Sequence, residues 1–407
     1  MTELPDYRGH AEHGLMKGYP PPREKVVTAA NGLWVPPYNR WAYQHMRRLL
    51  PSVPIARAAT PRELARVRNT AVDELHVTTP DELEVSLAEF LRSSYTDAMV
   101  VIHDDTIVWE HYDNGMTSST PHQMMSCTKS LIGLFALHAI HAGLAAESDR
   151  VDDHIEELAE SGFADASLGQ ILDMTNSLVF DETYDDPKAD IHAYAAIVGL
   201  GESASEIGSD SLYEYLATLH GDSEIEHGSV FRYQTPKTDV VNWVTNRLTH
   251  RSLFDDLDQL WSVIGGGDEA YVLVDRTGAP VAGGGLNASP EDLARFCAFV
   301  LADTGDLIST AVLNRIQSGG SVDAFLAGPD ALGVMTDGNW TYRAQWWVRN
   351  ESGREAMTAI GVNGQWVYLD RKRGVGIVKQ SSQPVAVDEQ IDDLTIGVFD
   401  RIIDLVG

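Results

Sequence analysis

The strongest candidate for chemistry is the segment Ser126-Cys127-Thr128-Lys129, in which a serine precedes a lysine by three residues. If the segment opens a helix, residues three apart lie on one face, so the two side chains can meet. A serine hydroxyl becomes a good nucleophile when a neighbouring base accepts its proton. A lysine among apolar neighbours can have its pKa lowered enough to be that base. The segment therefore predicts nucleophilic catalysis by Ser126 with Lys129 as its base.

A structural interpretation of the same residues stays open. Ser126 could cap a helix while Lys129 extends along the helix to solvent. The motif is short enough to occur by chance. However, this is the only S-x-x-K in the chain, and lysine is scarce, with seven in 407 residues. Its context therefore decides between the two interpretations.

The surrounding pattern predicts a buried helix behind a β-hairpin. Residues 126–143 are apolar nearly all round, which is typical of a helix inside a core. Before them, the apolar runs 98–102 and 107–109 flank a polar turn, as in an antiparallel hairpin. After them we expect mostly helical residues, then short strands and an amphipathic C-terminal helix; the strand runs are 342–348, 365–369 and 375–379, and the helix covers 391–406.

These elements predict an α/β (α+β) fold with an antiparallel sheet flanked by helices and interrupted by an inserted, mostly helical domain. Residues 1–60 are rich in proline and are expected to form an extended arm packed on the body, with one short helix near 41–50. The α/β domain is predicted from residues 61–143 and 281–407, and the helical domain from 144–280.

Composition narrows the class of partner. Sixty acidic against thirty basic residues give a net charge of −30, which disfavours nucleic acid and anionic membrane surfaces. No apolar run reaches the length of a membrane span, no export signal is evident, and two cysteines cannot form a disulfide framework. We expect a cytoplasmic protein acting on a small molecule, with a homodimer left open. The acidic excess suggests a surface adapted to high salt.

The order of these elements around Ser126 resembles the serine hydrolases related to class C β-lactamases and penicillin-binding proteins. Within that family, the chain is most similar to the 6-aminohexanoate-dimer hydrolases, which are nylon-oligomer amidases. Six segments in the same order along the chain carry the closer resemblance: Pro36-Pro37-Tyr38-Asn39-Arg40-Trp41-Ala42, Ile171-Leu172-Asp173-Met174, Glu182-Thr183-Tyr184-Asp185-Asp186-Pro187, Phe231-Arg232-Tyr233-Gln234-Thr235, Gln345-Trp346-Trp347 and Gly361-Val362-Asn363-Gly364-Gln365.

The resemblance implies a β-lactamase/transpeptidase-like fold and a set of site residues. Tyr233 corresponds to the catalytic tyrosine beside the serine and lysine, and the usual asparagine two residues later is Thr235 here. The implied oxyanion hole consists of the backbone N–H groups of Ser126 and Val362. The implied substrate-binding residues are Tyr184, Glu182, Trp347, Gly361 and Asn363. From residue types alone, Tyr233 and Trp347 could be core aromatics, Glu182 a solvated charge, and 361–364 a strand edge.

Departures from the family pattern limit the predicted substrate. Where β-lactamases carry Lys-Thr-Gly, which recognises the carboxylate of the drug, this chain has Ala359-Ile360-Gly361. Ala195 and Gly283 stand near family positions that contact substrate, and neither side chain can supply a polar contact. We therefore predict hydrolysis of a linear amide or ester through an acyl-enzyme on Ser126. A promiscuous carboxylesterase or β-lactamase and a non-catalytic penicillin-recognising sensor are the alternatives.

No metal site or cofactor is predicted. His138 and His141 are three residues apart, but no H-E-x-x-H motif or paired Cys/His spacing accompanies them. The glycine triplets at 265–267 and 283–285 lack the continuation of a dinucleotide or phosphate-binding loop, so we interpret them as ordinary loops.

Overall fold

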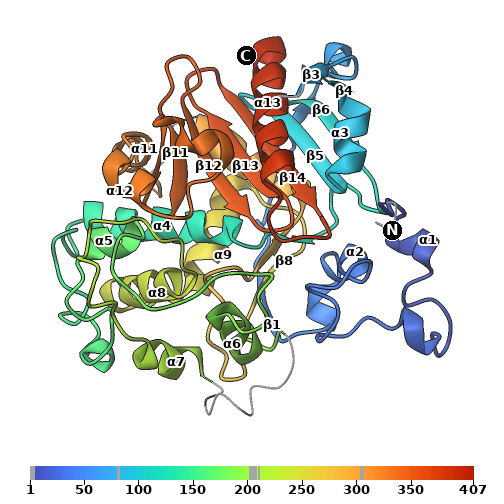
Figure 1. The fold of residues 1–407 in the computed structure, drawn as a ribbon. Helices are drawn as coiled ribbons and strands as arrows, with labels where there is room; N and C mark the ends of the chain where they lie inside the picture. The colour runs from blue at the N-terminus through green and yellow to red at the C-terminus, as the bar shows by residue number, and fades with distance from the viewer. Residues whose placement is uncertain (1–4, 80–82, 201–208, 210, 303–306) are drawn as a thin grey trace.

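An eight-stranded sheet organises the computed structural model, which describes residues 5–79, 83–200, 209, 211–302 and 307–407 (Figure 1). Neighbouring strands are antiparallel except for the edge pair β2 and β6, which is parallel. In spatial order the strands are β10 (Trp340–Arg343), β11 (Trp346–Arg349), β12 (Ala356–Gly361), β13 (Gln365–Asp370), β14 (Val375–Ser381), β5 (Thr96–His103), β6 (Thr106–Tyr112) and β2 (Ala65–Arg66).

The centre of this sheet is buried on both faces, which explains the nearly continuous apolar run of β5. Val100 and Ile102 belong to one hydrophobic core, whereas Met99 and Val101 belong to another on the opposite face. The predicted hairpin is confirmed, because β5 and β6 pair antiparallel around the turn at Asp104.

Helices cover both faces of the sheet. α4 (Cys127–His141) and α10 (Pro290–Leu301) pack on one face, whereas α3 (Leu87–Ser93) and α13 (Glu389–Val406) pack on the other. In Figure 1 the red helix α13 crosses in front of the strands. α4 is buried nearly all round, as its apolar composition predicts, and α13 confirms the predicted amphipathic C-terminal helix.

Helices are the main regular elements between α4 and the closing strands, although loops connect them over much of the segment, and α5 to α9 lie below the sheet in Figure 1. Its helix α8 packs against both α4 and α5, so the insertion abuts the helix that Ser126 precedes. The elements of this segment are η4 (Glu156–Leu158), α5 (Leu168–Leu172), α6 (Asp190–Ile197), α7 (Leu212–Thr218), α8 (Pro236–Thr249) and α9 (Leu253–Ile264); α11 (Thr310–Gln317), α12 (Val322–Ala327) and η6 (Gly333–Asp337) follow closer to the C-terminus.

A second, four-stranded sheet joins all three predicted segments of the chain. Its order is β1 (Ser52–Ile55), β8 (Ala270–Leu273), β9 (Leu286–Ala288) and β7 (His122–Gln123), and all its pairs are antiparallel. This sheet crosses the predicted limits at residues 60 and 280, so those limits do not separate layers of the fold. The division of the chain into domains at residues 60 and 280 therefore stays a prediction. A two-stranded sheet pairs β3 (His76–Thr78) with β4 (Glu84–Ser86), and η3 (Thr70–Val72) precedes it.

Two local predictions were wrong. The single helix expected near 41–50 is two short helices, α2 (Asn39–Ala42) and η2 (Met46–Arg48), in an arm that also contains α1 (His10–His13) and η1 (Arg23–Lys25). The strand expected over 342–348 is a hairpin of β10 and β11. Its turn residues Ala344 and Gln345 have φ of 47° and 66°, a left-handed conformation that an uninterrupted apolar and aromatic pattern does not reveal.

Among the described residues, no helix is both long and apolar enough to cross a membrane.

Candidate active site

Ser126 stands immediately before α4 and is not a side-chain cap. Its φ and ψ of −67° and −8° are already helical, and its hydroxyl makes no capping hydrogen bond. The preceding residue, Met125, has φ of 47°, an uncommon conformation for a residue with a side chain. This sharp turn carries the chain from β7 into the helix and leaves the Ser126 hydroxyl free for other contacts. The capping interpretation of Ser126 is therefore wrong.

Lys129 reaches back along the helix to the serine. Its Nζ lies 2.9 Å from Ser126 Oγ, 3.0 Å from Thr235 Oγ1 and 2.5 Å from the Gly283 carbonyl oxygen. Only 1% of Lys129 is exposed, so the alternative in which it extends to solvent is also wrong. Burial lowers the pKa of Lys129 to about 8, although the nearby carboxylates of Glu182 and Asp239 oppose that change. A lysine with this pKa can accept a proton near neutral pH.

Tyr233 completes the predicted trio. Lys129 Nζ lies 5.2 Å from the centroid of its ring, and its backbone N–H donates to Asp330 at 2.8 Å. Burial raises the pKa of Tyr233 well above its usual value, while an interaction with the Ser126 hydroxyl lowers it. The phenol is therefore protonated at neutral pH and can donate. The ring stacks on Trp347 at 5.6 Å and 24° between planes.

The end of β12 runs directly against the serine. A Cβ added to Gly361 would lie 3.0 Å from Ser126 N and 2.7 Å from the carbonyl oxygen of Met124, so no larger residue fits without a shift. Within the described part of the chain, the amides of Ser126 and Val362 donate no hydrogen bond. Both are thus available to an oxyanion, as the resemblance predicts.

A cavity of about 180 Å³ opens in front of these groups. Its walls are mainly apolar, and none of its lining residues is lysine, arginine or histidine. Ser126, Tyr184, Tyr233, Gly361 and Val362 line its reactive end; Leu332, Met335, Trp347, Ile360, Trp366, Val387 and Ile396 supply the apolar surface. No described residue in the lining of this cavity replaces the cation that is missing at Ala359-Ile360-Gly361.

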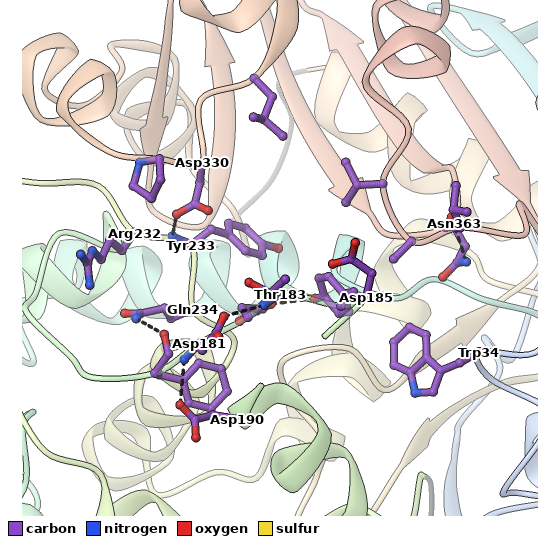
Figure 2. Close-up of a pocket in the computed structure, with 18 of the residues that line it drawn as sticks. Trp34, Asp181, Thr183, Asp185, Asp190, Arg232, Tyr233, Gln234, Asp330 and Asn363 are labelled. Carbon is purple, nitrogen blue, oxygen red and sulfur yellow. Dashed lines mark hydrogen bonds between the residues drawn. The ribbon is translucent and has the colours of Figure 1, made fainter. Parts of the chain in front are cut away.

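A wider hollow of about 940 Å³ adjoins the cavity and shares Glu182, Tyr184 and Tyr233 with it. Figure 2 shows Asp330 on one side of Tyr233 and Asp181 and Asp190 on the other. Among the described residues that line this hollow, Arg232 is the one cationic side chain. Its guanidinium lies 3.7 Å from Asp222, so a carboxylate already faces the cation.

The predicted substrate-binding residues have different positions. Trp347 and Gly361 line the cavity, and Tyr184 lies there with its hydroxyl donating to Glu182 at 2.7 Å. Glu182 is not a solvated charge, because its carboxylate also accepts two hydrogen bonds from Thr235. Asn363 lines the wider hollow, and its Nδ2 donates to the carbonyls of residues 383 and 385, which makes it a brace for that loop.

Sequence reasoning missed Asp239. This buried carboxylate on α8 accepts hydrogen bonds from the Tyr194 hydroxyl at 2.9 Å and from the Gly283 amide at 3.2 Å. Burial raises its pKa to about 7. Its position four residues after Thr235, in the first turn of α8, was the available signal, since residues four apart share a helix face.

Within the described residues, no group of three or more His, Cys, Asp and Glu side chains could hold a metal ion. Cys127 and Cys297 are both buried and free, and burial raises the pKa of both thiols.

Comparisons with known proteins agree with this geometry. The family model described as Beta-lactamase matches residues 91–398. The 6-aminohexanoate-dimer hydrolase of Paenarthrobacter ureafaciens is 32% identical over 359 residues, which cover 86% of each chain. A Bacillus anthracis structure, provisionally described as a 6-aminohexanoate-dimer hydrolase, has a TM-score of 0.82 and 26% identity over 94% of this chain and 97% of its own.

A more distant structure shares the fold alone. EstCE1, a hydrolase with promiscuous acyltransferase activity, has a TM-score of 0.58 and 14% identity over 78% of this chain and 98% of its own. The predicted fold class is confirmed by these matches. Ser126 and Tyr233 line one cavity, Lys129 contacts the serine, and the family match spans all three residues, so this chain belongs to the β-lactamase family of serine hydrolases.

Proposed function

We propose that this protein hydrolyses linear amides and esters of short, flexible acyl chains through an acyl-enzyme on Ser126. The observation that carries the proposal is the 2.9 Å contact between Lys129 Nζ and Ser126 Oγ at the reactive end of an apolar cavity. A serine paired with a base at hydrogen-bonding distance is the arrangement that covalent acyl transfer requires.

The geometry supports a two-stage reaction. Lys129 accepts the proton of Ser126 as Oγ bonds to the substrate carbonyl carbon, and the amides of Ser126 and Val362 stabilise the resulting oxyanion. Tyr233 donates its proton to the leaving amine or alkoxide and regains one from Lys129, so the serine proton ends on the leaving group. A water molecule then repeats the sequence in reverse, with its proton returning to Ser126 as the acid is released.

The cavity favours one class of substrate. Trp347 and Ile360 offer apolar surface to an acyl chain, and the cavity has no cation for the carboxylate of a β-lactam. The relative named above acts on the 6-aminohexanoate dimer, which is a linear amide. In this chain Ala195 is small and buried, and Gly283 packs against Thr235, so their side chains supply no polar contact for that dimer. We propose linear amides as the substrate class, with the nylon dimer cleaved inefficiently.

A carboxylesterase is the second candidate, because the same apolar cavity without a cation accepts neutral esters equally well. A chromogenic ester, a chromogenic cephalosporin and the 6-aminohexanoate dimer, assayed in parallel, separate these activities. We expect ester and amide turnover and little cephalosporin turnover.

The decisive experiment combines Ser126→Ala with mass spectrometry of the acylated peptide. We expect acyl transfer to the peptide containing Ser126 in the wild type, release of product under excess substrate, and loss of both in the variant. Full hydrolysis by Ser126→Ala would refute the proposal. Acylation without release would instead identify a penicillin-recognising sensor.

Two further proposals rest on composition. A net charge of −30 disfavours nucleic acids as partners, and we propose a cytoplasmic enzyme. Cell fractionation tests the location. Sedimentation analysis tests whether the protein is a homodimer.

A further inference from the structure

Lys129 can act as a base only if its lone pair faces Ser126. A charged lysine has three N–H donors, whereas the neutral amine has two N–H donors and one lone pair. The three neighbours of Nζ are Ser126 Oγ, Thr235 Oγ1 and the Gly283 carbonyl. The two N–H groups must face neighbours that accept a hydrogen bond, so the lone pair faces the remaining neighbour, which must be able to donate one.

The Gly283 carbonyl can only accept. Its position is fixed from behind, because the amide of Gly283 donates to Asp239, whose other oxygen accepts from Tyr194. A Cβ on Gly283 would lie 2.4 Å from Thr235 Cγ2, so the glycine allows this carbonyl and the threonine to approach Lys129 together.

Thr235 could in principle accept or donate, since a hydroxyl does both. Its hydrogen is committed to Glu182, because Thr235 Oγ1 donates to Glu182 Oε1 at 2.6 Å. The backbone amide of Thr235 donates to the other oxygen of the same carboxylate at 2.5 Å. Held in this way, the Thr235 hydroxyl presents only a lone pair to Lys129.

We propose that Glu182 is a positioning residue that acts through Thr235 to direct the lone pair of neutral Lys129 onto Ser126. The two N–H groups of the amine go to Gly283 and Thr235, so Ser126 is left to donate its proton to nitrogen. This inference rests on the proposed function, because it assigns a direction to the first proton transfer of that reaction. Glu182 touches neither the serine nor the substrate bond in this role.

The charges that face Lys129 set the expected pH behaviour. The carboxylates of Glu182 and Asp239 and the Cys127 thiol raise its pKa, against the larger effect of burial, and the Tyr233 ring packs beside it. Removing the Glu182 charge should therefore lower the pKa of Lys129. A role confined to folding would not move this value.

The first test uses a fluorophosphonate, which reports the nucleophilicity of Ser126 without a bound substrate. Phosphonylation rates of the full-length protein are measured from pH 6 to 10 for Thr235→Val and Thr235→Ser. We expect the plateau rate of Thr235→Val to fall by about 10- to 100-fold and that of Thr235→Ser to recover most of it. Thr245→Val is the matched control, because this threonine is buried on α8, which Thr235 immediately precedes, and its hydroxyl donates within that helix to the Val241 carbonyl.

The second test removes the charge with Glu182→Gln. The amide nitrogen of glutamine can donate to Thr235 Oγ1, which frees the threonine hydrogen to turn toward Lys129. We expect a plateau about tenfold lower and an acid limb shifted to lower pH. The double variant, which combines Thr235→Val with Glu182→Gln, should have the same plateau rate as Thr235→Val alone, because Glu182 acts through the Thr235 hydroxyl. Glu157→Gln, at an exposed ion pair with Arg247, is the control for the substitution itself.

Several outcomes overturn the proposal. One is an unchanged plateau rate in folded Thr235→Val and Glu182→Gln. Another is a double variant in which the two losses of rate add. A third is a Glu182→Gln profile whose acid limb shifts while its plateau rate does not fall. In each of these cases, labelling at Ser126 together with product release under excess substrate by the wild type would leave the proposed function standing. Labelling at another residue, or hydrolysis by Ser126→Ala, overturns the proposed function and this inference together.

Discussion

Lys129 and Lys237 are two buried lysines in adjacent helices with opposite surroundings. Both are almost fully buried, and burial lowers the pKa of Lys129 to about 8 and that of Lys237 to about 7. Lys237 donates to three backbone carbonyls, those of Met174, Asn176 and Arg232, at 2.9 to 3.0 Å. Lys129 has one carbonyl and two hydroxyls as partners.

The difference shows that burial alone does not make a lysine a base. Three carbonyls can only accept, so they hold Lys237 as a donor that ties the start of α8 to the loop after α5. A hydroxyl can give up its proton, and of these two lysines Lys129 is the one that contacts hydroxyls among the described residues, with the Ser126 hydrogen still free to move. The predictions below test this contrast.

The largest expected effect is on activity in Lys129→Met. Without the amine, no group accepts the Ser126 proton, so kcat/KM for an ester should fall by about 10³-fold or more. Thermal stability should hold or rise, because a buried charge is removed. Steady-state kinetics and a melting curve measure both quantities. A variant with near-normal turnover would show that the two lysines do not differ in role.

A smaller loss is expected in Gly283→Ala, because its Cβ would lie 2.4 Å from Thr235 Cγ2 and would move an acceptor of Lys129. We expect kcat to fall by about 10- to 100-fold with little change in KM. The neighbouring Gly284→Ala is the matched control, since its Cβ would meet nothing closer than 3.7 Å. Equal activity of the two variants would contradict the close-approach argument.

Lys237→Met should instead reduce stability. It leaves three carbonyls without this donor, and we expect a loss of about 1–3 kcal/mol in the free energy of unfolding. Turnover per folded molecule should fall far less than in Lys129→Met. Urea unfolding followed by activity at low denaturant measures the two effects. A loss of turnover as large as that of Lys129→Met would remove the contrast.

The pH dependence should follow Lys129 and not Lys237. Under the proposed mechanism the neutral amine of Lys129 is the active form, so kcat/KM should rise with pH and level off above about 8. In Lys237→Met, the rise of kcat/KM with pH should have the same midpoint as in the wild type, which a pH series of steady-state kinetics measures.

The titration of Lys129 should also make the stability of the protein depend on pH. In the unfolded chain Lys129 keeps its proton up to its ordinary pKa of 10.5, whereas the folded form loses it above about 8. The unfolded state therefore binds more protons between these values, and this lysine makes stability rise with pH in that window. A pH series of melting temperatures for wild type and Lys129→Met isolates the contribution.

The smallest effect concerns salt. Surface charges are screened by salt much more than buried ones, so KCl should act on the net charge of −30 and hardly on either lysine. We expect Tm to rise with KCl from low concentration while the acid limb of the pH profile stays near 8. A falling Tm would contradict the high-salt interpretation of the acidic surface.

Much of the site could be predicted because its residues belong to short motifs that can be recognised in the sequence. Ser126 and Lys129 lie three apart on one helix, and the apolar run after them predicts burial. The ordered motifs placed Tyr233 and Trp347 in the same family pattern, and both line the cavity.

Other parts could not be predicted, because their partners are distant in sequence. The sequence leaves Glu182 as either a substrate contact or a solvated charge, yet its carboxylate accepts a hydrogen bond from Thr235, 53 positions away. The position of Asp239 beside the site does not show in the sequence, because its partner, the Gly283 amide, lies on a loop 44 positions away. The hairpin at Ala344 depends on two positive φ angles that an apolar pattern hides.

The sequence by itself determined the pairing of Ser126 with Lys129 and the absence of the Lys-Thr-Gly anchor, because helix periodicity and residue identity act over a few positions. Only the tertiary structure decided where protons can go. Hydrogen-bond direction at Lys129 depends on whether each neighbour can donate, and three separate segments, carrying Thr235, Gly283 and Glu182, set that condition together.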